Sequence, residues 1–458
     1  MTLAAFLLLF LASLAGWAWN RRAAAALWRG GARLHSLPSY HGGTAALAVA
    51  VPGLALILVW LALQGAVIDW LLLASLPEAA TAALEPGARA LLQSEIASLA
   101  RGQVFGTPEP WKLAAAAHLV ALGQTSRALL LGAVALASGL ALFAAHRRVA
   151  AAFRARQNVE RILLGLMIGC ALVAIFTTIG IVASLAVESA RFFSMVPVTE
   201  FLFGTAWEPQ IPIRADQVAG AGAFGWLPVI LGTVVITAIA VGFAVPVGLL
   251  SAVYLNEFAS PRLRAVAKPL LEMLAGIPTV VYGFFAVLTV APALRGFAAG
   301  WGIEVAPNTA LVAGGVMGIM LIPFIASFAD DALAAVPRAL RDGSLALGAT
   351  RAETMTKVLI PAAIPGIAGG VLLAVSRAVG ETMIVVMAAG LIARMTINPL
   401  DSVTTVTVQI VTLLIGDTSF DNPKTLAAFA LGLMLFLVTL AINVLALRLV
   451  RKYREIYD

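Results

Sequence analysis

The sequence predicts an all-α fold, a polytopic bundle of helices that cross a membrane. Of the 458 residues, 61% are hydrophobic and only 12% are charged, whereas soluble domains usually carry about 25% charged residues. The hydrophobic residues gather in long runs, and short basic connections separate these runs. Together these observations exclude a water-soluble globular enzyme and indicate an integral membrane protein.

An α-helix needs about 20 apolar residues to cross the hydrocarbon core of a bilayer. Nine stretches reach or approach this length. They are residues 2–19, 44–68, 120–145, 162–188, 227–254, 270–293, 308–329, 363–391 and 426–447. No basic residue precedes the first stretch, whereas Arg21 and Arg22 follow it, which reverses the charge order of a signal peptide. We therefore expect a retained helix whose N-terminus lies outside.

Lysine and arginine gather on alternate connections between the predicted spans. The segments that hold 20 of the 30 basic residues are 21–33, 147–161, 262–268, 338–357 and 448–454. Cytoplasmic connections are the ones enriched in Lys and Arg. We therefore predict that these segments lie inside, with a periplasmic N-terminus and a cytoplasmic C-terminus.

Composition divides the chain into two parts. Residues 1–160 hold about three predicted spans, are dominated by Ala and Leu, and include an outside loop near 76–113. This part is predicted to be an N-terminal extension, because it shows no constellation of chemically active residues. Residues 161–458 hold six spans with Gly, Pro and Thr at intervals. We predict that this second part is the functional core, with a cytoplasmic loop near 330–361.

The sequence offers no clear set of residues for a metal or for ATP hydrolysis. Cys170 is the single cysteine, which excludes an internal disulfide framework and a cysteine-based metal site. The four histidines lack the i,i+4 spacing of helical metal ligands. None of the five lysines follows a glycine, as the phosphate loop of ATPases requires. We expect no metal and no cofactor in this chain, so any ATP is bound by a partner subunit.

The longest predicted inside connection of the core runs from Asp330 to Gly366. Segment 341–347 predicts a helical turn or two, Gly348 permits close approach of another surface, and Pro361 predicts the start of the next helix. A surface helix interrupted by glycine suits docking into a groove. The alternative is a solvated connector without a partner.

This connection resembles the cytoplasmic loop in the permease subunits of bacterial ABC importers. That loop reads Glu-Ala-Ala, three residues, Gly, nine residues, Ile, one residue and Leu-Pro. Here Asp342-Gly343-Ser344, Gly348 and Val358-Leu359-Ile360-Pro361 keep both spacings. The resemblance implies a loop that inserts into a cleft on a cytoplasmic ATPase and does no chemistry itself. The coupling residues would be Asp342, Leu345, Leu347, Gly348, Ala349, Arg351 and Pro361.

The predicted span 363–391 contains two ionisable residues, Arg377 and Glu381. Such residues cost about 2.5–3.5 kcal/mol on insertion scales and indicate a functional site by default. Their i,i+4 spacing places both on one helical face, where they can pair, and the planar arginine fork suits an oxyanion. Ser376 and Thr382 beside them are further pathway candidates. Two interpretations stay open, an anion pathway and a structural ion pair.

Longer segments of the core resemble the PstC family, the permease subunits of bacterial phosphate ABC importers. The matching segments are 191–193, 201–205 with Trp207, 224–228 with Gly232-Thr233, 254–259, 274–283 and 376–383. In that family the Arg and Glu of the last motif are implicated in phosphate translocation, and Arg377 and Glu381 match them. The resemblance covers about residues 161–458, and residues 1–160 resemble the extended N-terminal region of some longer members.

The resemblance implies a type I ABC importer permease, a six-helix core plus about three N-terminal helices in the bacterial inner membrane. It implies alternating access for inorganic phosphate, driven by ATP. The expected partners are a PstA-like second permease, a cytoplasmic PstB-like ATPase dimer that binds the ATP, and a periplasmic PstS-like phosphate-binding protein. The chain itself would be a transport subunit and not an enzyme.

Other functions stay open from the sequence alone. One Arg and Glu pair does not set the identity of an anion, so sulfate and molybdate are alternative substrates. A membrane component of phosphate signalling is a different class, and it could coexist with transport. A secondary transporter driven by an ion gradient would keep its uptake when the ATPase partner is inactivated.

Two further segments are weaker candidates for the pathway. Ile277-Pro278-Thr279 can open a helix and expose backbone groups, because proline removes one hydrogen bond of the helix; the alternative is a packing kink. Thr404, Thr405, Thr407 and Gln409 are predicted to line an outer segment between the last two spans. A solvated loop explains these four residues equally well.

Overall fold

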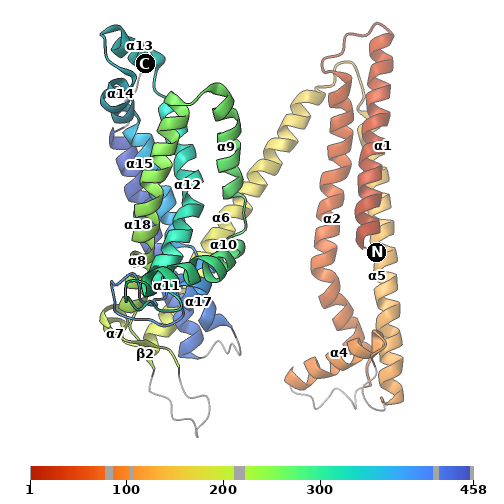
Figure 1. Cartoon of the computed structure of the whole chain (residues 1–458). Coiled ribbons are helices and arrows are strands. Elements are labelled where there is room, and N and C mark those ends of the chain that lie inside the picture. The colour runs from red at the N-terminus through yellow and green to blue at the C-terminus, as the bar shows by residue number, and fades with distance from the viewer. Residues whose placement is uncertain (1, 78–85, 104–107, 211–221, 416–421, 454–458) are drawn as a thin grey trace. The chain divides into compact units, whose positions relative to one another are not determined.

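The computed structural model describes residues 2–77, 86–103, 108–210, 222–415 and 422–453 (Figure 1). Parts of the predicted outside loop 76–113, and the basic residue at 454, lie outside these described residues. Within them the chain is almost entirely helical, and nine helices are long and apolar enough to cross a membrane. The predicted all-α, polytopic fold is confirmed.

The chain forms two compact units, residues 1–176 and 177–458, which are described here one at a time. The helices of the first unit are α1 (Thr2–Arg29), α2 (Pro38–Ser75), α4 (Pro86–Ala100), α5 (Pro110–Arg147) and the first part of α6 (Ala155–Met195). The boundary predicted after residue 160 falls inside α6. This division of the sequence therefore stays a prediction.

In the first unit, α1, α2 and α5 pack along their lengths around a small apolar cluster. Leu9, Ile57 and Val134 belong to it, one from each helix, and all three are buried. Gly42 lets α2 approach α1 closely, because a Cβ atom there would lie 2.7 Å from the carbonyl oxygen of Trp17. Small residues at such contacts are typical of helices in lipid.

The second unit continues from α6 into a short connecting segment and, within the described residues, five further membrane-spanning stretches. Its elements are α7 (Val198–Phe203), β1 (Trp207–Glu208), β2 (Ala223–Phe224), α8 (Leu227–Val253), the π-helical turn η1 (Tyr254–Phe258), α9 (Pro261–Ala275), α10 (Thr279–Phe285), the π-helical turn η2 (Ala286–Val290), α11 (Ala291–Ala299), α12 (Ala310–Ala334), α13 (Arg338–Ala346), α14 (Arg351–Thr354), the π-helical turn η3 (Met355–Leu359), α15 (Ile360–Val379), α16 (Met383–Ala388), α17 (Val406–Leu414) and α18 (Pro423–Tyr453). Strands β1 and β2 pair antiparallel, with Trp207 opposite Phe224.

Helices α8 and α12 form the centre of the second unit. Glycines on both helices bring the two backbones together. A Cβ atom at Gly314 would lie 2.8 Å from Ile239 Cβ, and one at Gly248 would lie 2.9 Å from Ile325 Cβ. The core therefore depends on the absence of side chains at the contact as much as on apolar side chains.

The helix predicted over 270–293 is wrong as a continuous span. Helix α9 ends at Ala275 and α10 begins at Thr279. Pro278 between them has extended backbone angles. The helix is interrupted here because proline has no N–H group to donate and disfavours helical geometry in the preceding residue, Ile277. The opening predicted at Ile277-Pro278-Thr279 is confirmed, and the apolar span runs over Thr279–Ala299 instead.

The helix predicted over 363–391 is wrong at both ends. A continuous helical run begins at Arg351, passes through η3, and ends at Val379. Pro361 lies in the first turn of α15, as predicted, but α15 continues without a break from the π-helical turn η3, whose widened turn accommodates the missing N–H donor. Beyond Val379, residues 380–382 interrupt the run before the short helix α16.

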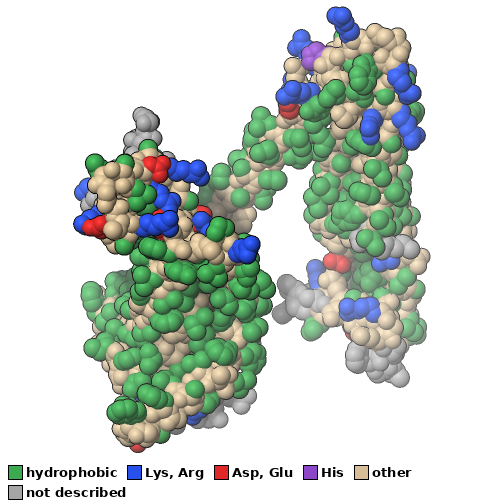
Figure 2. All heavy atoms as spheres, turned by 45° about the horizontal axis from the view of Figure 1, so that its top comes forward, with side chains coloured by type: hydrophobic (Ala, Val, Ile, Leu, Met, Phe, Trp, Pro, Cys, Tyr) green, Lys and Arg blue, Asp and Glu red, His purple; other side chains and the backbone are tan. Residues whose placement is uncertain are grey.

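Within each unit, the predicted inside segments gather at one end. In the first unit the backbone of His35 bonds Ala151, which joins the connections after α1 and α5. In the second unit α13, α14 and the C-terminal end of α18 lie at one end, and α7, β2 and α17 lie at the other (Figure 1). Figure 2 shows Lys and Arg concentrated at such an end, with hydrophobic side chains covering the helices below.

Candidate docking loop and transport pathway

The first candidate site is the docking loop, residues 338–350, which contains α13 and the turn after it. Helix α13 buries none of its side chains. Leu347 at its C-terminal end is 91% exposed and Leu345 is 39% exposed. The helix predicted over 341–347 is therefore confirmed, and its leucines point into solvent rather than into the protein's own core.

Specific polar contacts hold the docking loop in place. Arg341 of α13 forms an ion pair with Glu257 of η1, and the hydroxyl groups of Ser344 and Thr354 hydrogen bond over 2.9 Å. Gly348 has a φ of +88°, a left-handed conformation in which glycine avoids the steric cost that a Cβ atom brings. The loop is a shaped surface rather than a loose connector.

The helix after the docking loop starts with a capping box. The hydroxyl of Thr350 accepts the N–H of Glu353 at 3.3 Å, and the Glu353 carboxylate accepts the N–H of Thr350 at 3.0 Å. Such reciprocal bonds satisfy two backbone donors at the start of a helix. This cap fixes where Arg351, and the helix that leads to Arg377, begin.

Six of the seven predicted coupling residues lie together at one end of the second unit. Asp342, Leu345, Leu347, Gly348 and Arg351 are exposed, and Ala349 is partly exposed. The seventh, Pro361, is also exposed but lies ten residues beyond Arg351, roughly 15 Å further along the helix. The structure thus brings six of these residues together and separates Pro361 from them.

The second candidate site surrounds Arg377 near the end of α15. Its side chain is exposed in this chain. The guanidinium carbon lies 4.3 Å from the ring centre of Phe324 on α12, a cation–π contact. Among the described residues Arg377 forms no ion pair, so its charge is oriented by the aromatic ring without being neutralised.

The predicted pairing of Arg377 with Glu381 is wrong. Helix α15 ends at Val379, so the two residues do not share a helical face. The Glu381 carboxylate instead accepts the N–H groups of Met383 at 3.1 Å and Ile384 at 3.4 Å. A carboxylate at this position satisfies free donors and complements the helix dipole of α16.

Ser376 and Thr382 have separate local roles. The Ser376 hydroxyl donates to Asn443 of α18 at 3.1 Å, and the Thr382 hydroxyl donates to the Gly380 carbonyl at 3.4 Å. Both side chains are half-buried. Ser376 therefore links α15 to α18, while Thr382 stabilises the interruption between α15 and α16.

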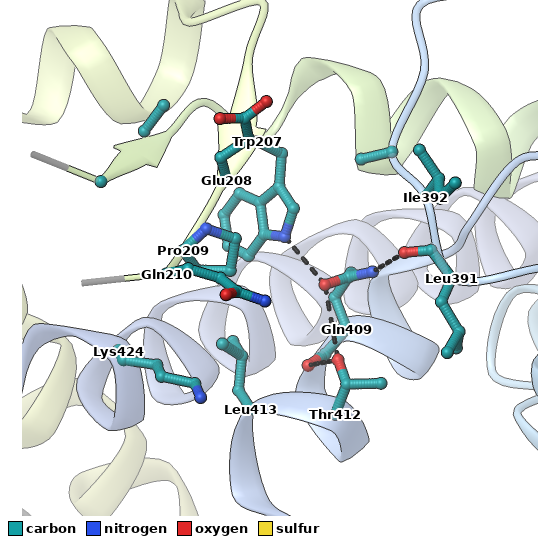
Figure 3. A pocket seen from close by; sticks show the side chains of 13 residues that line it. Trp207, Glu208, Pro209, Gln210, Leu391, Ile392, Gln409, Thr412, Leu413 and Lys424 are labelled. Carbon is teal, nitrogen blue, oxygen red and sulfur yellow. Dashed lines mark hydrogen bonds between the residues drawn. The ribbon is translucent and has the colours of Figure 1, made fainter. Parts of the chain in front are cut away.

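A polar cavity of about 780 Å³ opens at the end of the second unit opposite the docking loop (Figure 3). Trp207 and Glu208 line it from β1, Gln409 and Thr412 from α17, and Lys424 from α18. Gln409 connects these elements, because its amide accepts the Trp207 indole N–H at 2.9 Å and donates to the Leu391 carbonyl at 2.9 Å. The sequence pointed to Trp207 and to Gln409 separately, but it gave no signal that the two are in contact.

The residues 404–409 are not a solvated loop. Thr404, Thr405, Thr407 and Gln409 are all buried. The Thr407 hydroxyl donates to the Glu381 carbonyl at 2.9 Å, which ties α17 to the interruption after α15. These polar residues therefore stabilise the part of the core around Glu381.

Two buried acids were missed by sequence reasoning, Glu257 in η1 and Asp330 in α12. Glu257 lies within the matching segment 254–259, and Asp330 is the first residue of the predicted inside connection. Both follow directly after an apolar run, where the sequence alone suggests an exposed helix end. Their burial depends on basic partners from other elements.

Two family models match the chain. Residues 6–177 match the model described as "Phosphate ATP-binding cassette transporter". Residues 244–455 match "Binding-protein-dependent transport system inner membrane component". The two matches fall largely on the first and second units.

Curated relatives match more than half of the chain. The probable ABC transporter permease protein YqgH of Bacillus subtilis is 34% identical over 273 residues, which cover 59% of this chain and 84% of that protein. The phosphate transport system permease protein PstC 1 of Mycobacterium tuberculosis is 35% identical over 277 residues, which cover 55% and 81%. A solved bacterial alginate ABC transporter is 15% identical with a TM-score of 0.46, covering 65% of this chain and 98% of that one.

Proposed function

The chain belongs to the PstC family of phosphate transport system permease proteins, and from this premise we propose that it moves inorganic phosphate from the periplasm to the cytoplasm. As a permease it is a multi-pass membrane protein and a transport subunit, not an enzyme. The observation that carries the proposal is the 35% identity with the mycobacterial phosphate permease over 81% of that protein. The geometry of the docking loop and of Arg377 supports it.

The partners follow from the same premise. A PstA-like permease would pair with this chain in the bacterial inner membrane, above a PstB-like ATPase dimer that binds the ATP. A PstS-like periplasmic protein would deliver phosphate at the outer end, where the 780 Å³ cavity opens. This arrangement requires a periplasmic N-terminus and a cytoplasmic C-terminus, as the basic segments predict.

The docking loop would transmit the closure of the ATPase dimer to the membrane helices. Leu345 and Leu347 would insert into a groove on the ATPase, since exposed leucines beside a helix end suit such a groove. Gly348 would keep the turn tight, and Asp342 and Arg351 would supply polar contacts at the rim. The loop binds and moves, and the ATPase performs the chemistry.

Arg377 would meet the phosphate in the pathway. Its guanidinium is exposed and stacked on Phe324, which leaves its N–H donors available for two parallel hydrogen bonds to an oxyanion. Glu381 would act differently, by holding the start of α16 in place beside the pathway. Ser376 and Thr382 would shape the same region through their contacts with Asn443 and Gly380.

The N-terminal extension, residues 1–160, is proposed as a separate part that carries three membrane helices. The core, residues 161–458, would hold the pathway and the docking loop. The helix α6 would connect them, since it contributes to both compact units.

Anion uptake into vesicles tests the proposed function. The vesicles contain this chain with its candidate partners, and labelled phosphate, sulfate and molybdate are compared with and without ATP on the ATPase side. We expect uptake that requires ATP and is selective for phosphate. Uptake of sulfate or molybdate instead would overturn the substrate. A verified complex without ATP-dependent uptake would overturn the transport function and favour a signalling role.

A further inference from the structure

Asp330 is a buried acid near the docking-loop end of α12, and it is only 6% exposed. Its carboxylate accepts hydrogen bonds from Asn256 at 2.7 Å, from Arg264 at 3.0 Å and from Lys268 at 2.7 Å. A buried carboxylate is stable only when charges and hydrogen bonds compensate for its lost hydration. These four residues, here named the Asp330 hub, join η1, α9 and α12.

The docking loop reaches this hub through one π-helical turn. Asn256 and Glu257 are adjacent in η1, yet Asn256 bonds Asp330 whereas Glu257 pairs with Arg341 of α13. Glu257 is 7% exposed, so the carboxylate of this second ion pair is also shielded from water. A continuous series of polar contacts therefore runs from α13 through η1 to Asp330.

Helix α9 packs only lightly on the core. None of its side chains is buried, and its large apolar residues Leu263, Val266, Leu270 and Met273 are exposed. A cavity of about 20 Å³ lies beside Lys268 and Asp330, so packing there is incomplete. The hydrogen bond with Asp330 raises the pKa of Lys268, which keeps this link charged. Besides the Tyr282 hydroxyl, which donates to the Leu274 carbonyl at 2.8 Å, the Asp330 hub supplies the polar side-chain contacts that join α9 to the core in the described part of the chain.

Movement of α9 has a route to the pathway. Helix α9 leads through the opening at Gly276–Pro278 into α10. Helix α10 packs closely on α16, because a Cβ atom at Gly283 would lie 2.6 Å from the Met387 sulfur. Helix α16 is the helix that Glu381 caps.

We propose that Asp330 is a positioning residue that passes the movement of the docking loop to α9, and through α10 to α16 beside the phosphate pathway. The inference rests on the proposed transport function and adds the internal connection that couples ATP hydrolysis to it. Asp330 acts through its basic partners and touches no substrate. A purely structural staple would instead affect assembly and ATP hydrolysis as much as transport.

The first test compares Asp330→Asn with Asp331→Asn in the full chain, assembled with its partners in vesicles. Asp331 is the matched control, because it is an exposed neighbour of the same type. For Asp330→Asn we expect normal assembly and ATP hydrolysis but about a tenfold drop in phosphate moved per ATP hydrolysed. Asp331→Asn should stay within about twofold of the parent. An unchanged ratio for Asp330→Asn, or an equal fall of hydrolysis and uptake, would overturn the proposal.

Glu257→Gln provides a second variant, should Asp330→Asn fail to assemble. It weakens the link between α13 and η1 and leaves the partners of Asp330 unchanged. The same loss of phosphate moved per ATP hydrolysed is expected. Full coupling in the Glu257→Gln complex would overturn the proposed route.

A distance measurement tests the movement itself. Spin labels are placed at Ala265→Cys on α9 and Leu250→Cys on α8, both exposed, after Cys170→Ser removes the single native thiol. In the parent complex, ATP should change the distance between the labels, and in Asp330→Asn the change should vanish. A change that persists in Asp330→Asn would overturn the hub. Absence of phosphate uptake by the parent complex would count against the proposed function instead, and the label distances would still test the link from α13 to α9.

Discussion

Gly348 shows how one backbone angle shapes a binding surface. Its φ of +88° lies in the left-handed region, and no atom lies within 4 Å of the position that a Cβ atom would occupy. A side chain at this position therefore clashes with no other atom of this chain. Its free-energy cost comes from the left-handed backbone conformation and from any atom of a docked partner that occupies the same space. That cost is about 1–2 kcal/mol for most residues and lower for Asn.

We predict that Gly348→Val abolishes phosphate uptake, whereas Gly348→Asn keeps a substantial part of it. The β-branched side chain disfavours the turn and occupies the docking face, and asparagine tolerates a positive φ. Uptake and co-purification of the ATPase are measured on the same vesicles. Equal uptake by the parent and the Val variant, with the complex assembled, would count against a coupling role for the docking loop.

Arg377 gives a second prediction at this scale. Arg377→Gln should abolish phosphate uptake without loss of membrane insertion or assembly, because the exposed guanidinium leaves no buried carboxylate behind. Arg448→Gln on α18, also an exposed arginine, serves as the control and should retain uptake. Disappearance of the Arg377→Gln variant from the membrane would favour a structural role.

The sequence could identify these residues but not their mutual geometry. Arg377 and Glu381 stand out because ionisable residues are rare inside apolar runs. Their i,i+4 pairing assumed a continuous helix. Glu381 instead bonds the backbone of α16, and Thr407 bonds the Glu381 carbonyl, and such long-range contacts leave no local signal.

At the scale of helices, the close packing of α8 and α12 depends on glycines of each helix that face side chains of the other. Gly314 faces Ile239 of α8 at a distance that excludes a Cβ atom, whereas the adjacent Gly315 has no atom within 4 Å of its Cβ position. Both glycines lie inside α12 and share the same intrinsic helix propensity. The pair therefore separates the effect of packing from the effect of propensity.

We predict that Gly314→Val lowers the stability of the core by about 1–3 kcal/mol, because it forces two packed backbones apart. Gly315→Val should be close to neutral. The fraction of protein that stays monodisperse after heating in detergent measures the difference. Equal loss for the two variants would show that the contact between α8 and α12 does not limit stability.

Long apolar runs in the sequence predicted most of the membrane-spanning helices, whereas the breaks within the predicted helices were harder to predict. Pro278 gave a local signal for the opening after α9, since proline lacks an N–H donor. The local signal for the end of α15 at Val379 was weaker, because Gly380 alone does not stop a helix in lipid. The helical run before Pro361 was missed because a π-helical turn accommodates proline within it.

At the scale of the whole molecule, the two compact units correspond to different matches. The first unit matches one family model over residues 6–177, and the second unit matches another over residues 244–455. The second unit has its own buried clusters around α8, α12 and α18. A core with its own interior is expected to fold without the extension.

We predict that a chain lacking residues 1–154 inserts into the membrane and supports ATP-dependent phosphate uptake with its partners. Helix α6 would then start the chain, and Arg156 and Arg161 at its beginning favour an inside location. Uptake normalised to the amount of assembled complex is compared with that of the full chain. Failure of the shortened chain to insert would assign the extension a role in biogenesis of the core.

The exposure of Leu345 and Leu347 has a consequence for the life of the protein in the cell. Burying a leucine side chain contributes about 1.5–3 kcal/mol, and in the proposed complex this gain would be available only once an ATPase covers the docking loop. With the proposed orientation, a subunit made in excess would display an apolar patch to the cytoplasm, the kind of surface that chaperones and proteases recognise. The cellular level of this permease is expected to follow the level of its ATPase, so that the docking surface also sets the stoichiometry of the transporter.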